Sequence, residues 1–267
     1  MDHFIFASIF VFGAIIGSFL NVVVLRFDTG ASISRGRSKC FSCGKTLSWY
    51  ELVPIFSFLF QGGRCKGCRS KISWQYPAIE ISGGLAALAA YLWALPGQGA
   101  LSVASFALLA ALLFLYIAIT AYDLRHKIIP DEFSYGAAAV ALALLGVEWA
   151  ATGTLDFGRL AAGPALFAFF GFFWLVSKGT WMGLGDAKLA LSIGWALGLS
   201  AGVASVLLSF WTGAAFAFAA MAIQKIRSRR GLGLKSEIPF GPFMIVGFLL
   251  SLLFRIDIQA ILSFLAV

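Results

Sequence analysis

Long apolar runs separated by short polar segments make up most of this chain. The runs cover residues 4–25, 78–95, 101–122, 134–151, 160–177, 187–199, 201–223 and 239–265. A helix of about 20 apolar residues crosses the roughly 30 Å hydrocarbon core of a bilayer. We therefore expect an all-α polytopic membrane protein with about eight transmembrane helices. The run at 187–199 is short for a span, and residues 187–223 could instead form one long kinked element.

Composition supports the membrane interpretation. Hydrophobic residues make up 60% of the chain and charged residues 12%, and the mean hydropathy is +0.91. These values lie outside the range of ordinary soluble domains. No Lys or Arg precedes the first apolar run and Arg26 follows it, so residues 1–25 are expected to stay as a transmembrane helix rather than act as a cleavable signal.

The basic residues predict the orientation, because Lys and Arg concentrate in cytoplasmic loops. With eight spans and the first loop inside, 18 of the 20 Lys and Arg residues fall on the cytoplasmic side. Only Arg159 and Arg255 fall on the far side, and the N-terminus lies outside. The net charge of +8 then reflects topology, so we expect the lipid bilayer and no nucleic acid as a partner.

Residues 26–77 form the one long soluble stretch and contain every cysteine of the chain. Cys40, Cys43, Cys65 and Cys68 make two CxxC pairs separated by 21 residues. Two such pairs suit a tetrahedral zinc site with four thiolate ligands. A disulfide framework and a redox CxxC are the alternatives, and the predicted cytosolic location disfavours the first. The domain prediction is a first helix at 1–25, a zinc-stapled cytoplasmic loop domain at 26–77 and a membrane core at 78–267.

An apolar segment lies between the two cysteine pairs. Residues 49–60 are too apolar for a solvated loop and too few to cross the membrane. We expect this segment to lie on the bilayer surface.

Two carboxylates stand at the ends of apolar runs. Asp123 ends the third run, and Asp186 follows the Gly183-Leu184-Gly185 turn just before the sixth. A carboxylate costs energy within a membrane segment, and the predicted topology brings both to the cytoplasmic face. A pair that shares a proton, as in aspartic proteases, would explain them. Helix capping or pairing with nearby basic residues is the alternative for each.

Other polar residues have simpler interpretations. Asp131 and Glu80 lie near predicted helix starts, where acidic side chains act as caps and dipole partners. Asn21 follows the small-residue pair Gly13 and Gly17, which lets another helix approach closely. For Asn21 an interhelical hydrogen bond is at least as reasonable as a functional role.

Several motifs resemble one known family. GSFLNVVVLR at 17–26, the double CxxC loop ending in ISWQYPAIE, YDLRHKIIPD and GLGDAKL occur in the order seen in bacterial type IV prepilin peptidases. The resemblance covers most of residues 13–190. The first cysteine pair departs from the family's Cys-Pro-x-Cys form, because Phe41 replaces the proline.

The resemblance implies an intramembrane aspartic endopeptidase of the bacterial inner membrane. Asp123 and Asp186 would be the catalytic pair on the cytoplasmic side, supported by Gly183, Gly185 and Lys188 of the GxGD region. The substrates would be type IV prepilins or type II secretion pseudopilins. The resemblance also implies methylation of the new N-terminus with S-adenosylmethionine, and Gly63 matches a glycine that the family associates with methyl transfer.

Helix directions suggest different roles for the two aspartates. Asp186 precedes a predicted helix, whose positive end favours the ionised form, so we expect it to be the base that activates water. Asp123 ends a predicted helix and would be the acid that protonates the leaving amine. A proton-coupled transporter using the aspartates as a relay and a zinc-loop scaffold without chemistry are the alternative functions. Oligomeric state and the identity of the pilin substrates stay open.

Overall fold

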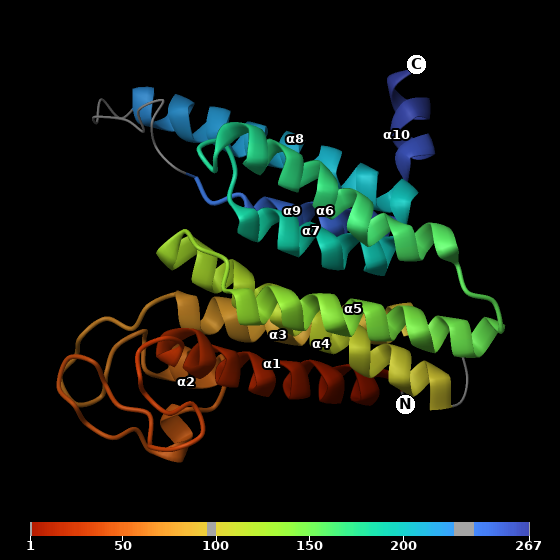
Figure 1. Cartoon of the computed structure of the whole chain (residues 1–267). Helices are drawn as coiled ribbons and strands as arrows, with labels where there is room; N and C mark the ends of the chain where they lie inside the picture. The colour runs from red at the N-terminus through yellow and green to blue at the C-terminus, as the bar shows by residue number, and fades with distance from the viewer. Residues whose placement is uncertain (1, 95–99, 227–237, 267) are drawn as a thin grey trace. The chain divides into compact units, whose positions relative to one another are not determined.

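The computed structural model describes residues 2–94, 100–226 and 238–266, and within these ranges the regular structure is helical (Figure 1). The elements are α1 (Asp2–Arg26), η1 (Trp49–Glu51), α2 (Phe56–Phe60), α3 (Gln75–Ala94), α4 (Ala100–His126), α5 (Asp131–Thr152), α6 (Phe157–Ser177), α7 (Leu184–Leu197), α8 (Leu199–Ile226), α9 (Gly241–Phe254) and α10 (Ile258–Leu265). The predicted all-α fold is therefore confirmed.

The chain divides into two compact units, Met1–Ala121 and Tyr122–Val267. The first unit holds α1, α3, most of α4 and the cysteine loop, the name used here for residues 27–74. The second holds α5 to α10 together with the last residues of α4. The finer division at residues 25 and 77 stays a prediction.

In the first unit α1 packs against α3. The approach is close because a Cβ atom at Gly13 would lie 2.4 Å from the carbonyl oxygen of Gly83, and one at Gly17 would lie 2.7 Å from that of Ile79. These distances are shorter than any real Cβ contact, so only glycine fits at both positions. The small-residue pair thus allows close helix approach as expected.

In the second unit α7 is the most enclosed helix. It contacts α5, α6, α8 and α9, and Ala187, Leu189 and Ala190 have no exposed surface. An apolar helix buried on all sides belongs to a core. Asp186 lies in the first turn of this helix, so the fold places the carboxylate in the interior of the unit.

The number of spans differs from the prediction of about eight. Six described helices are long and apolar enough to cross a membrane, or up to seven if the bent pair α9 and α10 counts as one span. These two helices meet at 88°. The predicted span at 187–199 corresponds to α7, which has 14 residues and rises only about 21 Å. It is separate from α8, because the chain breaks at Gly198 with a φ of 80°.

Candidate active site and metal centre

Asp123 lies in the last turn of α4 and is 4% exposed. The N–H of Lys127 donates to the Asp123 carbonyl oxygen at 2.7 Å, and Lys127 adopts a left-handed φ of 57° that ends the helix. The N–H of Gly241, the first residue of α9, donates to the Asp123 carboxylate. The side chain is thus directed at the start of α9.

Asp186 is 8% exposed and lies in the first turn of α7. Its Oδ2 accepts the N–H of Gly183 at 3.2 Å, so the carboxylate caps its own helix. Gly185 is needed for close packing, because a Cβ atom there would lie 2.9 Å from the Cβ of Ile129. Two glycines of the GLGD sequence therefore fix Asp186 through the backbone.

The two carboxylates belong to the same unit and are close enough for their charges to interact. We call Asp123 and Asp186 the aspartate site. Like charges held together in a water-poor region favour sharing of a proton, which gives one acid and one base. Such a pair can activate water and protonate a leaving group. Asp186 is predicted from the sequence to be the base and Asp123 the acid. The geometry does not distinguish them in this way, since both carboxylates accept an N–H from the start of a helix.

Lys188 lies near the aspartate site in sequence but pairs elsewhere. Its Nζ is 2.6 Å from Oδ1 of Asp131 and 5.1 Å from the ring centroid of Tyr135. The ion pair joins the start of α5 to the first turns of α7. Asp131 begins α5 as predicted. Its ion pair with Lys188 also joins α5 to α7.

Gly241 and Ile129 were missed by the sequence analysis. Gly241 follows Phe240 and precedes Pro242 at the start of the last apolar run. Glycine and proline at a helix start are a recognisable signal for a helix N-terminus. The sequence gives no sign, however, that this N-terminus meets Asp123.

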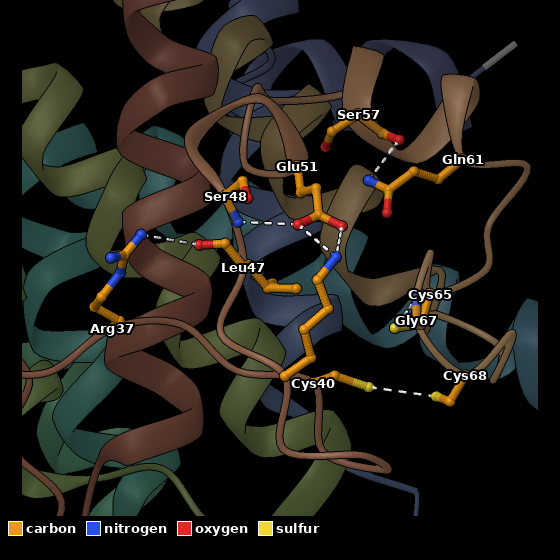
Figure 2. Close-up of polar contacts among 11 residues, drawn as sticks. Arg37, Cys40, Leu47, Ser48, Glu51, Ser57, Gln61, Cys65, Gly67 and Cys68 are labelled. Carbon is orange, nitrogen blue, oxygen red and sulfur yellow. Dashed lines mark hydrogen bonds and ion pairs between the residues drawn. The ribbon is translucent and has the colours of Figure 1, made fainter.

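The cysteine loop brings all four cysteines together. The four Sγ atoms lie within 4.8 Å of one another. Figure 2 shows the Sγ atoms of Cys40 and Cys68, which are 3.9 Å apart. Zn–S bonds of about 2.3 Å in a tetrahedron require S–S separations near 3.8 Å. All four thiols are free, which disfavours the disulfide alternative. The cysteines therefore fit a four-thiolate metal site.

The two CxxC turns have the same hydrogen-bond pattern. The N–H of Cys40 donates to Lys45 and that of Cys65 to Ser70, both at 2.9 Å. Each turn also has a left-handed residue at its fifth position and closes in an isolated antiparallel bridge. The second turn has one further hydrogen bond, in which the Gly67 N–H donates to Cys65 Sγ at 3.3 Å. Two equivalent turns with inward thiols are what a shared metal ion needs.

Backbone donors also favour the thiolate form in the first turn. The N–H groups of Cys43 and Ser42 lower the pKa of the Cys40 thiol to about 6. Ser70, through its hydroxyl and its backbone, lowers the pKa of Cys68. At Cys43 the N–H of Lys45 acts in the same direction, but burial and the neighbouring thiols outweigh it and raise the pKa to about 11. Metal binding requires deprotonated thiols, so the hydrogen-bond donors favour the metal-binding form at Cys40 and Cys68 only.

An ion pair between the buried Glu51 and the partly exposed Lys45 holds the region between the cysteine turns (Figure 2). Glu51 is buried and accepts from the Ser48 N–H at 2.9 Å and from Lys45 Nζ at 2.9 and 3.1 Å. The Ser48 N–H and then Lys45 lower the pKa of the Glu51 carboxyl. Lys45 belongs to the first CxxC turn, so this pair ties that turn to η1.

Gly63 lies in the turn after α2. Its φ is 64°, and a Cβ atom there would lie 3.1 Å from Cζ of Phe58. The Phe58 ring is buried, and its centroid lies 4.8 Å from that of Trp74.

At the other end of α2, Ile55 has a left-handed φ of 63° and donates its N–H to Glu80 at 2.7 Å. Glu80 therefore anchors α2 rather than capping its own helix.

Asn21 makes the interhelical contact expected of it. Its Nδ2 donates to the carbonyl oxygen of Tyr76 on α3 at 3.3 Å. The residue is buried at the α1–α3 contact. This is the interhelical hydrogen bond that the sequence analysis expected.

Comparisons with known proteins agree with this arrangement. Residues 11–94 match a family model described as the bacterial peptidase A24 N-terminal domain, and residues 107–218 match one described as the type IV leader peptidase family. The first match ends at Ala94, the last residue of α3, and the second covers Asp123 and Asp186. No solved structure matches the chain.

Several curated relatives carry the name prepilin leader peptidase/N-methyltransferase. The protein from Bacillus subtilis (strain 168) is 33% identical over 263 residues, which cover 96% of each chain. The one from Burkholderia pseudomallei (strain 1026b) is 32% identical over 89% of this chain and 81% of its own. The Aeromonas hydrophila protein is 30% identical over 93% and 90%. This chain therefore belongs to the type IV leader peptidase family.

Proposed function

We propose that this chain removes the leader peptide from type IV prepilins or type II secretion pseudopilins and then methylates the new N-terminal amine. The observation that carries the proposal is the pair of buried carboxylates, one in the last turn of α4 and the other in the first turn of α7. The relatives' names support both activities. The transporter alternative finds no support among them.

Cleavage would follow general acid–base chemistry. The ionised carboxylate of the pair accepts a proton from water as the water oxygen attacks the scissile carbonyl carbon. The protonated carboxyl then donates its proton to the leaving amine as the C–N bond breaks. The sequence-based prediction gives the first role to Asp186 and the second to Asp123. The Gly183 N–H on Asp186 and the Gly241 N–H on Asp123 hold the two carboxylates in place. The role assigned to each aspartate stays a prediction.

The cysteine loop would hold structural zinc through Cys40, Cys43, Cys65 and Cys68. A closed four-thiolate site leaves no open coordination position, so zinc would supply folding energy there. S-adenosylmethionine would supply the methyl group, and Gly63 stays a candidate for that activity.

The proposed orientation in the membrane rests on the distribution of Lys and Arg along the chain. The cysteine loop and the aspartate site would face the cytoplasm, with the N-terminus outside the inner membrane. Trp49, Phe56 and Phe60 are more than half exposed. Exposed aromatic side chains beside a polar loop suit a membrane interface, which supports the predicted surface segment.

The test uses purified protein in lipid with a purified prepilin. We expect a product shortened by its leader and, after addition of S-adenosylmethionine, a product heavier by one methyl group. Inhibitors of serine, cysteine and metallopeptidases should have no effect on cleavage. An uncleaved prepilin together with proton-coupled solute uptake in vesicles would favour the transporter instead.

A further inference from the structure

We propose that Gly241 is a positioning residue for Asp123, because its N–H holds the carboxylate and its missing side chain leaves the space that the carboxylate fills. The proposal concerns the first residue of α9 and rests on the proposed peptidase function only where it predicts cleavage rates. Its structural part, a contact between residue 241 and the Asp123 carboxylate, can be tested without any substrate.

The hydrogen bonding of the first turn of α9 supports this role. The first N–H groups of a helix have no partner within the helix. Here Pro242 has no N–H, and the N–H groups of Phe243 and Met244 both donate to the carbonyl oxygen of Phe240, at 3.0 and 3.1 Å. The Gly241 N–H donates to Asp123. The carboxylate therefore completes the N-terminus of α9.

The space around Gly241 points to the same conclusion. A Cβ atom at this position would lie 2.7 Å from Oδ2 of Asp123 and 3.1 Å from Cδ1 of Ile129. Real Cβ contacts are not this short to an oxygen atom, so any larger residue must displace the carboxylate or the helix. Gly241 is buried, and the Asp123 carboxylate sits where its side chain would be.

Ile129 links this contact to the second aspartate. The same side chain that lies against Gly241 also lies against Gly185, where a Cβ atom would be 2.9 Å from Ile129 Cβ. Gly185 directly precedes Asp186. One buried isoleucine thus sets the spacing between the backbone that holds Asp123 and the backbone that carries Asp186.

Aromatic packing prevents α9 from moving away. The ring centroid of Phe240, just before Gly241, lies 5.0 Å from that of Phe210 on α8 and 6.3 Å from that of Phe170 on α6. Phe170 is fully buried. A well-packed interior resists a shift of this turn, so an added methyl group at residue 241 would displace the Asp123 side chain first.

The first experiment measures the contact as an energetic coupling. Thermal unfolding is compared for the wild type, Gly241→Ala, Asp123→Ala and the double variant in the same lipid. We expect Gly241→Ala to lower the Tm by several degrees, and we expect the drop to be smaller in the Asp123→Ala background, where no carboxylate meets the new methyl group. An equal drop in both backgrounds would overturn the proposal, whatever the protein's activity.

The second experiment measures the reaction. In Gly241→Ala the kcat for prepilin cleavage should fall about 100-fold, the effect of displacing a reacting group by about 1 Å. KM should change little, and methyl transfer to a synthetic peptide that already begins with phenylalanine should be retained. Near-normal cleavage by Gly241→Ala would contradict the positioning role. A wild type that cleaves no prepilin would instead contradict the proposed function.

Three further variants separate positioning from packing. Gly247→Ala, in the same helix, would place a Cβ atom 2.2 Å from the Ser205 carbonyl oxygen, far from Asp123 in the chain, so both activities should fall together with the folded fraction. Gly146→Ala meets nothing within 4 Å and should behave as the wild type. Adding Ile129→Val to Gly241→Ala removes the contact between the new methyl group and Ile129 Cδ1 but keeps the contact with the Asp123 carboxylate. Cleavage by this double variant should therefore stay low. Full recovery of cleavage would show that packing against Ile129, and not the Asp123 contact, caused the loss.

Discussion

The cysteine loop and the aspartate site are built in different ways. In the loop each pair of thiols is placed by hydrogen bonds within its own turn, such as Cys40 to Lys45 and Cys65 to Ser70. In the aspartate site Asp186 is also held locally, by the Gly183 N–H at the start of its own helix, but the group that holds Asp123 comes from α9. A locally built site depends on its own few residues, whereas an assembled site depends on the packing of a whole unit.

This difference predicts that the two sites can be damaged separately. They belong to different compact units. Loss of the metal should loosen residues 27–74 and leave α5 to α9 packed. Loss of an aspartate should stop cleavage without affecting the loop.

The largest effect is expected from removing either carboxylate. Asp123→Asn and Asp186→Asn keep the shape of the side chain but cannot exchange a proton, so cleavage should fall by about a thousandfold or more. Zinc content, membrane insertion and methyl transfer to a peptide beginning with phenylalanine should be unchanged. Quantitative mass spectrometry of the prepilin measures the cleavage. Substantial cleavage by one variant would remove that residue from the mechanism.

The next largest effect is expected at the metal site. Purified protein should contain about one zinc per chain, measured by elemental analysis. Cys43→Ser should lose the metal and make the cysteine loop sensitive to proteases, with methyl transfer reduced more than cleavage. A wild type that contains no zinc and has free or disulfide-linked thiols would contradict the metal assignment.

A smaller effect on stability and methyl transfer is expected from alanine at Gly62 or Gly63, and comparing the two variants separates backbone strain from packing. Gly62 and Gly63 have φ values of 58° and 64°, but only at Gly63 does a Cβ atom meet a neighbour, the Phe58 ring at 3.1 Å. Either alanine variant should lose about 1–2 kcal/mol from backbone strain. Gly63→Ala should in addition displace Phe58 and reduce methyl transfer. Equal methyl transfer in the two variants would show that the Phe58 contact is unimportant.

The smallest effect concerns acid sensitivity of the loop. Ser48 and Lys45 hold the pKa of Glu51 below its usual 4.5, so folding gains stability from this group above that pH and loses it as the pH falls further. Proteolysis of residues 27–74 should therefore accelerate below about pH 4.5. Glu51→Gln should be more sensitive than the wild type at neutral pH, and the difference should shrink in acid. A constant difference would exclude this ion pair as the cause.

Local features of this fold could be predicted from the sequence, and features that depend on packing could not. The apolar runs predicted the helices, the CxxC spacing predicted the clustering of the four cysteines, and Gly13 and Gly17 predicted a close helix contact. The run at 187–199 was predicted as a span because its apolar residues do not reveal whether lipid or protein surrounds them. The role of Gly241 was missed because a contact between α4 and α9 leaves no local pattern.

The aspartates were found partly for a physical reason and partly by resemblance. Their energetic cost in a membrane segment marked Asp123 and Asp186, and the motif order suggested their chemistry. The predicted acid and base roles relied on helix ends along the chain. The structure adds the N-terminus of α9 at Asp123, so that argument no longer distinguishes the two carboxylates.

One measurement tests the separation of the two sites most directly. A single prepilin is incubated with S-adenosylmethionine and either Asp186→Asn or Cys43→Ser, and the mass of every product is recorded. We predict only uncleaved prepilin with Asp186→Asn, and cleaved prepilin largely without the methyl group with Cys43→Ser. Cleavage by Asp186→Asn, or loss of cleavage in Cys43→Ser while α5 to α9 remain folded, would contradict the account.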